Sequence, residues 1–447
     1  MMHKLIIALG LLCFFQGFSQ DAQQQFSLRE AIDFALQNNR TAINATRDIE
    51  AAKKQKWETT ATGLPQINIA TDYQNFLKQQ VQLIPAEFFG GNAGEFAEVT
   101  FGTKQNVTAT ATLSQLLFDG SYIVGLQSAK VYLQISENAK IKTDLEVRKA
   151  VINAYGNVLL AEETTAILNK NITILNDNLN ETTKIYENGL EEEESVEQLK
   201  ITLSSLESSL RNSERLKTLA YQMLNIILGL DLNTTTTLTD NLETLTAQNM
   251  MDMALLNADE SVENTIDYKI AENNMTSTEL LLKLEKSKFL PTLSAFVNGG
   301  YNGFGDQFKF LNKEQDWFGS SLFGVSLNIP VFSSFGKQAA TQRAKINLEK
   351  AKTELTETEQ QIKLEIDNAK SEYQFAIEDY DNKKENLNLA ERIEAKNQTK
   401  FFEGIGSSFD LRQAQTQLYT AQQEFLQAML NVINSKAELE TVLNVVN

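Results

Sequence analysis

Four segments of the chain, each about ten residues long, alternate between apolar and polar positions. They are residues 66–77, 106–118, 292–304 and 321–332. In the second segment, for example, Val107, Ala109 and Ala111 alternate with threonines. A period of two with one apolar face predicts β-strands. Strands of soluble sandwiches share this pattern, so alternation alone favours a membrane barrel only weakly.

Between these segments the chain has unusually long stretches without proline. The four prolines stand at positions 65, 85, 291 and 330. Within the proline-free stretches apolar residues recur every three or four positions, as at Leu168, Ile172, Leu175 and Leu179. A sustained spacing of this kind predicts long helices packed as left-handed coiled coils. We expect two antiparallel helical hairpins, 121–229 and 337–447, that turn near residues 189 and 404–406.

The same order of elements occurs twice along the chain. LPQINIATDYQN at 64–75 is matched by LPTLSAFVNGGYN at 290–302, and IYENGL at 185–190 by KFFEGI at 400–405. These matches predict a tandem structural repeat. Its copies are residues 20–229 and 261–447, and a connector at 230–260 that we expect to hold no site joins them. A capping box of Ser27 and Glu30 begins the first helix.

The first nineteen residues have the features of a secretory signal peptide. A short apolar run follows Lys4, and the small residues Gly17 and Ser19 precede a cleavage point before Gln20. A lipoprotein signal at Cys13 is the alternative, but Leu12 rather than a small residue stands before the cysteine. Cleavage removes the only histidine, His3, and the only cysteine, so only carboxylate-based catalysis remains. We therefore expect neither an enzyme nor a cofactor.

The balance of charges narrows the possible partners. The chain has 40 Lys+Arg against 58 Asp+Glu, a formal net charge of −18. So acidic a protein lacks the basic surface that nucleic-acid binding requires. The sequence after the signal also has no run of eighteen apolar residues, so we expect it to enter a membrane only as a closed β-barrel.

Four strands are too few to close such a barrel. Bacterial outer-membrane barrels have at least eight strands, and an eight-stranded barrel is filled by its own side chains. Three copies supply twelve strands and leave a lumen, so a conducting protein is expected to be a homotrimer. The signal peptide delivers the chain to the periplasm. The connections 78–105 and 305–320 should then face outside, and the helices should lie in the periplasm.

The chain resembles the TolC-like outer-membrane efflux family over nearly all of residues 26–445. The resemblance rests on SLREAIDFALQNN, the paired LPQ and LPT strand starts, SQLLFDG and NIPVFSSFG, and the tip motifs YENGL and FFEGIGSSFDLRQAQ. It implies an α+β channel, a twelve-stranded trimeric barrel in outer-membrane lipid above a long α-helical periplasmic barrel. The partners implied are a periplasmic adaptor and an inner-membrane transporter of the resistance-nodulation-division or ABC class.

The resemblance also implies an acidic gate at the periplasmic mouth. Asp410 matches the first of two family aspartates, but Gln413 stands at the second position, which puts a second acidic ring in doubt. Four glutamates after the first hairpin turn restore the negative charge: Glu191, Glu192, Glu193 and Glu194. The competing interpretation is that all five acids are ordinary solvated charges at helix starts.

The residues expected to contact the adaptor are those of the two turns: Gly189, Leu190, Gly404, Ile405 and Gly406. We predict a positive φ angle for the three glycines, as turn residues. Aromatic residues near the strand ends are expected to anchor the protein at the lipid interface.

Two functions of other classes compete with an export channel. One is a periplasmic coiled-coil protein with a structural or interaction role and no channel. The other is a carboxylate-based exported enzyme, against which the tandem repeat and the lack of a compact α/β pattern both count.

Overall fold

The computed structural model describes residues 24–250, 255–256 and 261–445. The predicted signal peptide lies outside these residues. The chain divides into two compact units. The first comprises the residues up to Ile49, Ser136–Ala271 and the residues from Leu355 onward, and the second comprises Glu50–Ile135 and Glu272–Glu354. Both units draw on both halves of the sequence.

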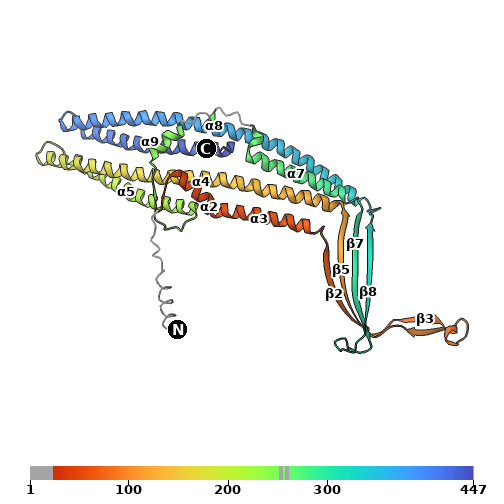
Figure 1. The fold of residues 1–447 in the computed structure, drawn as a ribbon. Helices are drawn as coiled ribbons and strands as arrows, with labels where there is room; N and C mark the ends of the chain where they lie inside the picture. Colours follow the sequence, from red (N-terminus) through yellow and green to blue (C-terminus); the bar gives the residue numbers. More distant parts are fainter. Residues whose placement is uncertain (1–23, 251–254, 257–260, 446–447) are drawn as a thin grey trace, which may run out of the picture. The chain divides into compact units, whose positions relative to one another are not determined.

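The second unit holds a four-stranded antiparallel sheet, in the order β2-β5-β7-β8 (Figure 1). Its strands are β2 (Gln66–Asn75), β5 (Gln105–Asp119), β7 (Thr292–Gly305) and β8 (Trp317–Asn328). All four predicted strands are present. The prediction for the last one was displaced, because β8 begins four residues before 321 and ends at Asn328 instead of 332. Pro330 has no amide hydrogen to donate to a sheet.

The connection between β2 and β5 contains a second, smaller sheet that the sequence analysis missed. Strand β3 (Val81–Pro85) pairs antiparallel with β4 (Phe96–Thr100), and the 3-10 helix η1 (Ala86–Phe89) lies between them. Each strand has only five residues. Neither VQLIP nor FAEVT alternates strictly between apolar and polar residues, so the strand pattern is incomplete in both.

Six helices account for most of the chain: α3 (Arg40–Ala61), α4 (Gly120–Glu187), α5 (Glu193–Leu228), α7 (Ile266–Ser287), α8 (Gly336–Phe402) and α9 (Ser408–Leu443). Helices α4 and α8 have 68 and 67 residues, and α5 and α9 have 36 each. The two long helices, and the two helices that follow them, therefore agree in length between the two halves of the chain. Within the described residues no helix is apolar enough over a sufficient length to cross a membrane.

The two copies differ at the start of their long helices. β5 runs directly into α4, since Asp119 is the last strand residue and Gly120 the first helical one. Between β8 and α8, residues 329–335 belong to no helix or strand. Ser334 and Phe335 in this segment have φ angles of 49° and 62°, which side chains other than glycine rarely adopt.

The N-terminal helix begins as predicted and then breaks. Ser27 and Glu30 form the capping box of α2 (Leu28–Asn38). Asn39 ends α2, and its Oδ1 accepts the amide of Thr41 at 2.8 Å, which starts α3. Its Nδ2 donates to the carbonyl of Ile227 at 2.7 Å, so the break also attaches the helix to α5.

The predicted connector packs into the core of the first unit. Strand β6 (Thr236–Leu238) pairs in parallel with β1 (Gln24–Phe26), and α6 (Leu242–Met250) follows. The hydroxyl oxygen of the fully buried Tyr155 lies 2.9 Å from both the Phe26 carbonyl and Asp240 Oδ2. Burial raises the pKa of Tyr155 well above its ordinary value, so this hydroxyl stays protonated and joins the connector to α4.

Candidate functional site at the hairpin tips

Both hairpins turn by the same backbone motif. At the end of α4, the amide of Gly189 donates to Tyr186 O at 2.7 Å and that of Leu190 to Ile185 O at 3.1 Å. At the end of α8, the amide of Gly404 donates to Phe401 O at 3.0 Å and that of Ile405 to Lys400 O at 2.9 Å. These are Schellman motifs, which place a residue with positive φ directly after the helix.

The predicted positive φ angle is correct for two of the three tip glycines. Gly189 has φ 76° and Gly404 has φ 74°. For Gly406 the prediction was wrong, because its φ is not positive. Gly406 is glycine because a larger residue would lack space. An added Cβ would lie 2.9 Å from the Cβ of Lys400, where the amide of Gly406 donates to the Lys400 carbonyl at 3.0 Å.

At both tips, an exposed apolar residue directly follows the glycine of positive φ. Leu190 is 78% exposed and Ile405 is 72% exposed. In a Schellman motif this position commonly packs against the last turn of its own helix. At both tips that packing is largely absent, so each hairpin presents one aliphatic side chain outward at the same place.

At the second tip, Asp410 belongs to a helix cap. Ser407 is the N-cap of α9, and its Oγ accepts the amide of Asp410 at 3.1 Å. The same Oγ donates to Asp410 Oδ2 at 2.7 Å. The carboxylate is exposed and lies in the first turn, where it also complements the helix dipole. Gln413, the predicted departure from the family pattern, is exposed on the same helix.

At the first tip, the four glutamates surround the start of α5. Glu191 is half-buried, and Glu192, Glu193 and Glu194 are exposed. Glu192 is the N-cap residue but makes no side-chain capping bond. Glu194 Oε1 accepts Gln198 Nε2 at 2.7 Å. Three of the four carboxylates thus extend into solvent at the positive end of the helix dipole.

A direct contact joins the two tips. Ser195 Oγ, in the first turn of α5, donates to Ser408 Oγ, in the first turn of α9, at 2.8 Å. Ser195 is buried. The starts of the two return helices therefore lie side by side, and the acidic positions at both tips belong to one region of the chain.

Buried polar side chains lie between the helices behind the tips, and the sequence analysis did not identify them. Gln398 Nε2 donates to Asn178 Oδ1 at 3.1 Å, and Asn171 Nδ2 donates to Gln422 Oε1 at 2.8 Å. Both asparagines are almost fully buried. Asparagine at every seventh position among leucines could have indicated them, since a polar residue in a coiled-coil core specifies register.

Two titratable groups on α8 and α9 have shifted pKa values. Burial raises the pKa of Glu394, although the neighbouring Gln415 amide partly opposes this shift. Burial, together with the nearby charge of Glu394, raises the pKa of Tyr419 to about 12. In both groups burial disfavours the ionised form relative to the same group in water.

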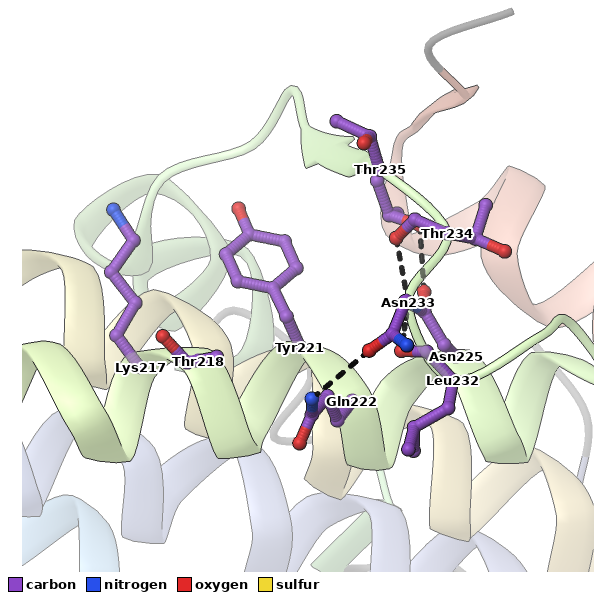
Figure 2. Close-up of a pocket in the computed structure, with 10 residues that line it drawn as sticks. Lys217, Thr218, Tyr221, Gln222, Asn225, Leu232, Asn233, Thr234 and Thr235 are labelled. Carbon is purple, nitrogen blue, oxygen red and sulfur yellow. Dashed lines mark hydrogen bonds between the residues drawn. The ribbon is translucent and has the colours of Figure 1, made fainter. Parts of the chain in front are cut away.

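A pocket of about 330 Å³ lies between the C-terminal part of α5 and the threonine-rich loop 232–236 (Figure 2). The buried Asn225 holds this loop: its Nδ2 donates to Thr234 O at 2.8 Å, and its Oδ1 accepts the Thr236 hydroxyl at 2.7 Å. Gln222 Nε2 lies 3.4 Å from Asn233 Oδ1. Because the amides bond within the protein, we interpret the pocket as part of the loop's attachment.

The comparisons with known proteins agree with this arrangement. The model of the family described as outer membrane efflux protein matches residues 258–445. The outer membrane protein VceC of Vibrio cholerae is 16% identical, with a TM-score of 0.72 over 94% of this chain and 96% of its own. CusC is 18% identical, with a TM-score of 0.75 over 96% and 98%. No curated protein sequence matches the chain.

The open-state MtrE channel of Neisseria gonorrhoeae is similar too, at 17% identity and a TM-score of 0.71 over 94% of this chain and 89% of that one. Residues 258–445 are thus similar to the outer membrane efflux protein family. The family model matches most of the second repeat, while the structural matches extend over nearly the whole chain. Together, the family-model match and the structural matches confirm the predicted fold class, the outer-membrane location and a channel function in place of an enzyme. The family forms trimers and acts in tripartite systems.

Proposed function

We propose that three copies of this chain form the exit channel of a tripartite efflux or secretion system. In this proposal a periplasmic adaptor docks on the hairpin tips. An inner-membrane transporter of the resistance-nodulation-division or ABC class drives the substrate into the helical barrel. The substrate then leaves through the barrel that the strands form in the outer membrane. No specific observation favours the competing non-channel coiled coil.

The observation that carries the adaptor contact is the pair of equivalent aliphatic residues, Leu190 and Ile405. Each follows a glycine of positive φ and is more than two thirds exposed. Apolar side chains held out on rigid turns are suitable anchors for a protein interface, since burial of apolar surface favours protein–protein association. Three copies supply six such anchors on one rim.

The test of adaptor docking is site-specific cross-linking in cells. A photoreactive residue at position 190 or 405 should capture the adaptor, and Leu190→Ser together with Ile405→Ser should weaken both capture and export. Leu216→Ser and Ile201→Ser serve as the control, because these residues are also exposed but lie on the side of α5. Equal loss of export in both double variants would overturn the docking site.

We also propose that the acids of the tips form a negatively charged constriction. Three copies of Asp410 and Glu191–Glu194 would bring fifteen carboxylates to the periplasmic mouth. Their fields add, and the low-dielectric wall of a narrow passage concentrates them. The mouth should therefore favour cations over anions, and multivalent cations should block it.

Single-channel recording tests the constriction. The variant with Glu191, Glu192, Glu193 and Glu194 changed to glutamine should lose cation selectivity and block by trivalent cations. The matched control neutralises four exposed glutamates elsewhere on the helices: Glu207, Glu214, Glu385 and Glu391. If selectivity and block persist in the tip variant, or fall equally in the control, the acids revert to solvated helix-start charges.

A further inference from the structure

Positive charge gathers where the helices of the second unit meet the sheet. Four segments adjoin the strand ends: residues 53–61, 120–130, 280–288 and 336–345. Together they hold ten lysines and arginines but only two glutamates, in a chain whose net charge is −18. We call the lysines and arginines of these four segments the cationic collar. The excess of charge here is opposite in sign to that of the protein as a whole.

On α3, part of the collar shares one face with an exposed tryptophan. Lys53 and Lys54 precede Trp57 by four and three residues, so all three project from the same side of the helix. Trp57 is 62% exposed, and both lysines are exposed as well. Ala52, on another face, is buried. An exposed indole beside two ammonium groups is typical of a membrane–water interface, not of an aqueous helix surface.

A second aromatic and cationic cluster lies where α7 ends and α8 begins. Lys337 Nζ donates to the carbonyl of Lys288 at 2.6 Å and lies 5.8 Å from the centre of the Phe289 ring. Phe335, one residue before α8, is largely exposed although its φ is positive. A bulky side chain rarely adopts this conformation, which is strained. The turn therefore holds an aromatic ring outward against its own backbone preference.

We propose that the cationic collar binds the headgroups of anionic phospholipids in the periplasmic leaflet of the outer membrane. The proposal rests on the proposed function, which places the sheet in the membrane and its helix-bearing edge at that leaflet. The ammonium groups pair with lipid phosphates, the long lysine stems lie along the acyl boundary, and Trp57 and Phe335 occupy the headgroup level. Both repeats contribute to the collar, so in a trimer it encircles the channel.

The aromatic residues decide between a lipid and a soluble anion. A soluble anionic substrate would need the cations alone. Exposed rings beside the cations on both α3 and the α7–α8 junction match the amphipathic boundary of a bilayer. The collar also lies within a few helical turns of the first strand residues, Gln66 and Thr292, and therefore close to the edge of the sheet.

The experiment counts lipids bound to the intact protein purified in detergent. The protein is equilibrated with equal amounts of phosphatidylglycerol and phosphatidylethanolamine, and retained lipids are measured by native mass spectrometry. The test variant changes five collar lysines to glutamine: Lys53, Lys54, Lys56, Lys286 and Lys288. The control variant changes five exposed lysines distant from the sheet: Lys184, Lys200, Lys384, Lys396 and Lys400.

We expect the wild type and the control to retain phosphatidylglycerol in preference, with a preference that falls as salt shortens the Debye length. Each lysine near an anionic surface strengthens binding by a factor of about five. The preference of the test variant for phosphatidylglycerol should therefore fall at least about tenfold. An unchanged preference in the test variant overturns the proposal. A second result would also overturn the proposal: the test variant retains lipid as the wild type does, but its ion selectivity in a neutral bilayer is altered. That result would place these lysines along the conduction path. Single-channel conductance of the same preparations tests the channel separately, since a conducting protein without lipid preference refutes the collar alone.

Discussion

The two hairpin tips have the same backbone conformation, but their acidic residues occupy different positions. Both close with a Schellman motif, and the helices that follow have the same length. At the second tip the cap is Ser407 and the third helical residue is Asp410, which bond to each other. At the first tip the order is reversed, with Glu192 at the cap and Ser195 at the third position. Ser195 then bonds to Ser408 on the other hairpin.

Because of this reversal, the acidic residues of the two tips have different roles. Asp410 has a local structural role that a solvated acid does not, because its carboxylate and its amide both bond to Ser407. The glutamates of the first tip have no capping bond and are free to act through their charge. The first tip is therefore the stronger candidate for the acidic constriction, although Asp410 is the residue that the family resemblance implied.

The largest expected effect is that of a proline that interrupts the hairpin leading to the first tip. Leu175 of α4 is 0% exposed and packs with Leu168, Leu199 and Leu206. Proline at this position removes a helical hydrogen bond and clashes with the preceding turn, which costs about 3 kcal/mol or more. Leu175→Pro should therefore sharply reduce the yield of trimer, while Leu175→Met should not. Normal assembly and export by the proline variant would contradict a continuous α4.

Much of the fold could be predicted because its periodicities are long. The spacing of Leu168, Ile172, Leu175 and Leu179 predicted a packed helix face, and in the structure these residues cluster with leucines of α5. The hairpin β3–β4 was not predicted, because neither of its strands alternates strictly between apolar and polar residues. The displacement of β8 has a related cause: alternation continues through Ile329 and Val331, but pairing ends at Asn328, before Pro330.

The tips could be predicted in position but not in detail. Glycines among polar residues indicated the turns, and the positive φ of Gly189 and Gly404 followed. Gly406 needs space instead of a special φ, and this depends on the distance to Lys400, which no local pattern encodes. The contact of Ser195 with Ser408 joins residues 213 positions apart. Such a contact requires the packing of the two hairpins to be known.

The next expected effect compares the charges of the two tips. Neutralising Glu191–Glu194 should reduce cation selectivity more than neutralising Asp410 does, because four charges are removed per chain instead of one. Asp410→Asn is the suitable variant, since an asparagine oxygen still accepts the bond from Ser407 while the charge is lost. Reversal potentials in a salt gradient give the measurement. A greater effect of Asp410→Asn would invert the ranking of the tips.

Removal of the cap should have a smaller and local effect. Ser407→Ala deletes the acceptor for the Asp410 amide, and the loss of such a cap costs about 1 kcal/mol. Hydrogen exchange of the first-turn amides of α9 should become about fivefold faster. Ser195→Ala removes no cap, so the first turn of α5 should keep its exchange rate. Equal acceleration at both helix starts would show that the contact between the tips, and not the cap, holds them.

The smallest expected effect is a pH dependence behind the second tip. Burial raises the pKa of Glu394 in the folded protein above its unfolded value of about 4.3. The neutral acid is thus the form that folding favours. Its contribution to stability is complete below the unfolded pKa and is lost as pH rises through the folded pKa. Glu394→Gln keeps a neutral side chain at every pH, so at pH 7.5 the variant should unfold at a slightly higher temperature than the wild type.

At pH 4 that difference should vanish, because the wild-type acid is then largely protonated. Glu391→Gln, one turn away and exposed, is the control that should show no such pH dependence. The measurement is the apparent melting temperature of the trimer at the two pH values, at one protein concentration. A variant that is less stable at pH 7.5 would mean that the ionised carboxylate has a favourable partner. In that case the neighbouring Gln415 amide, and not burial, governs the ionisation of Glu394.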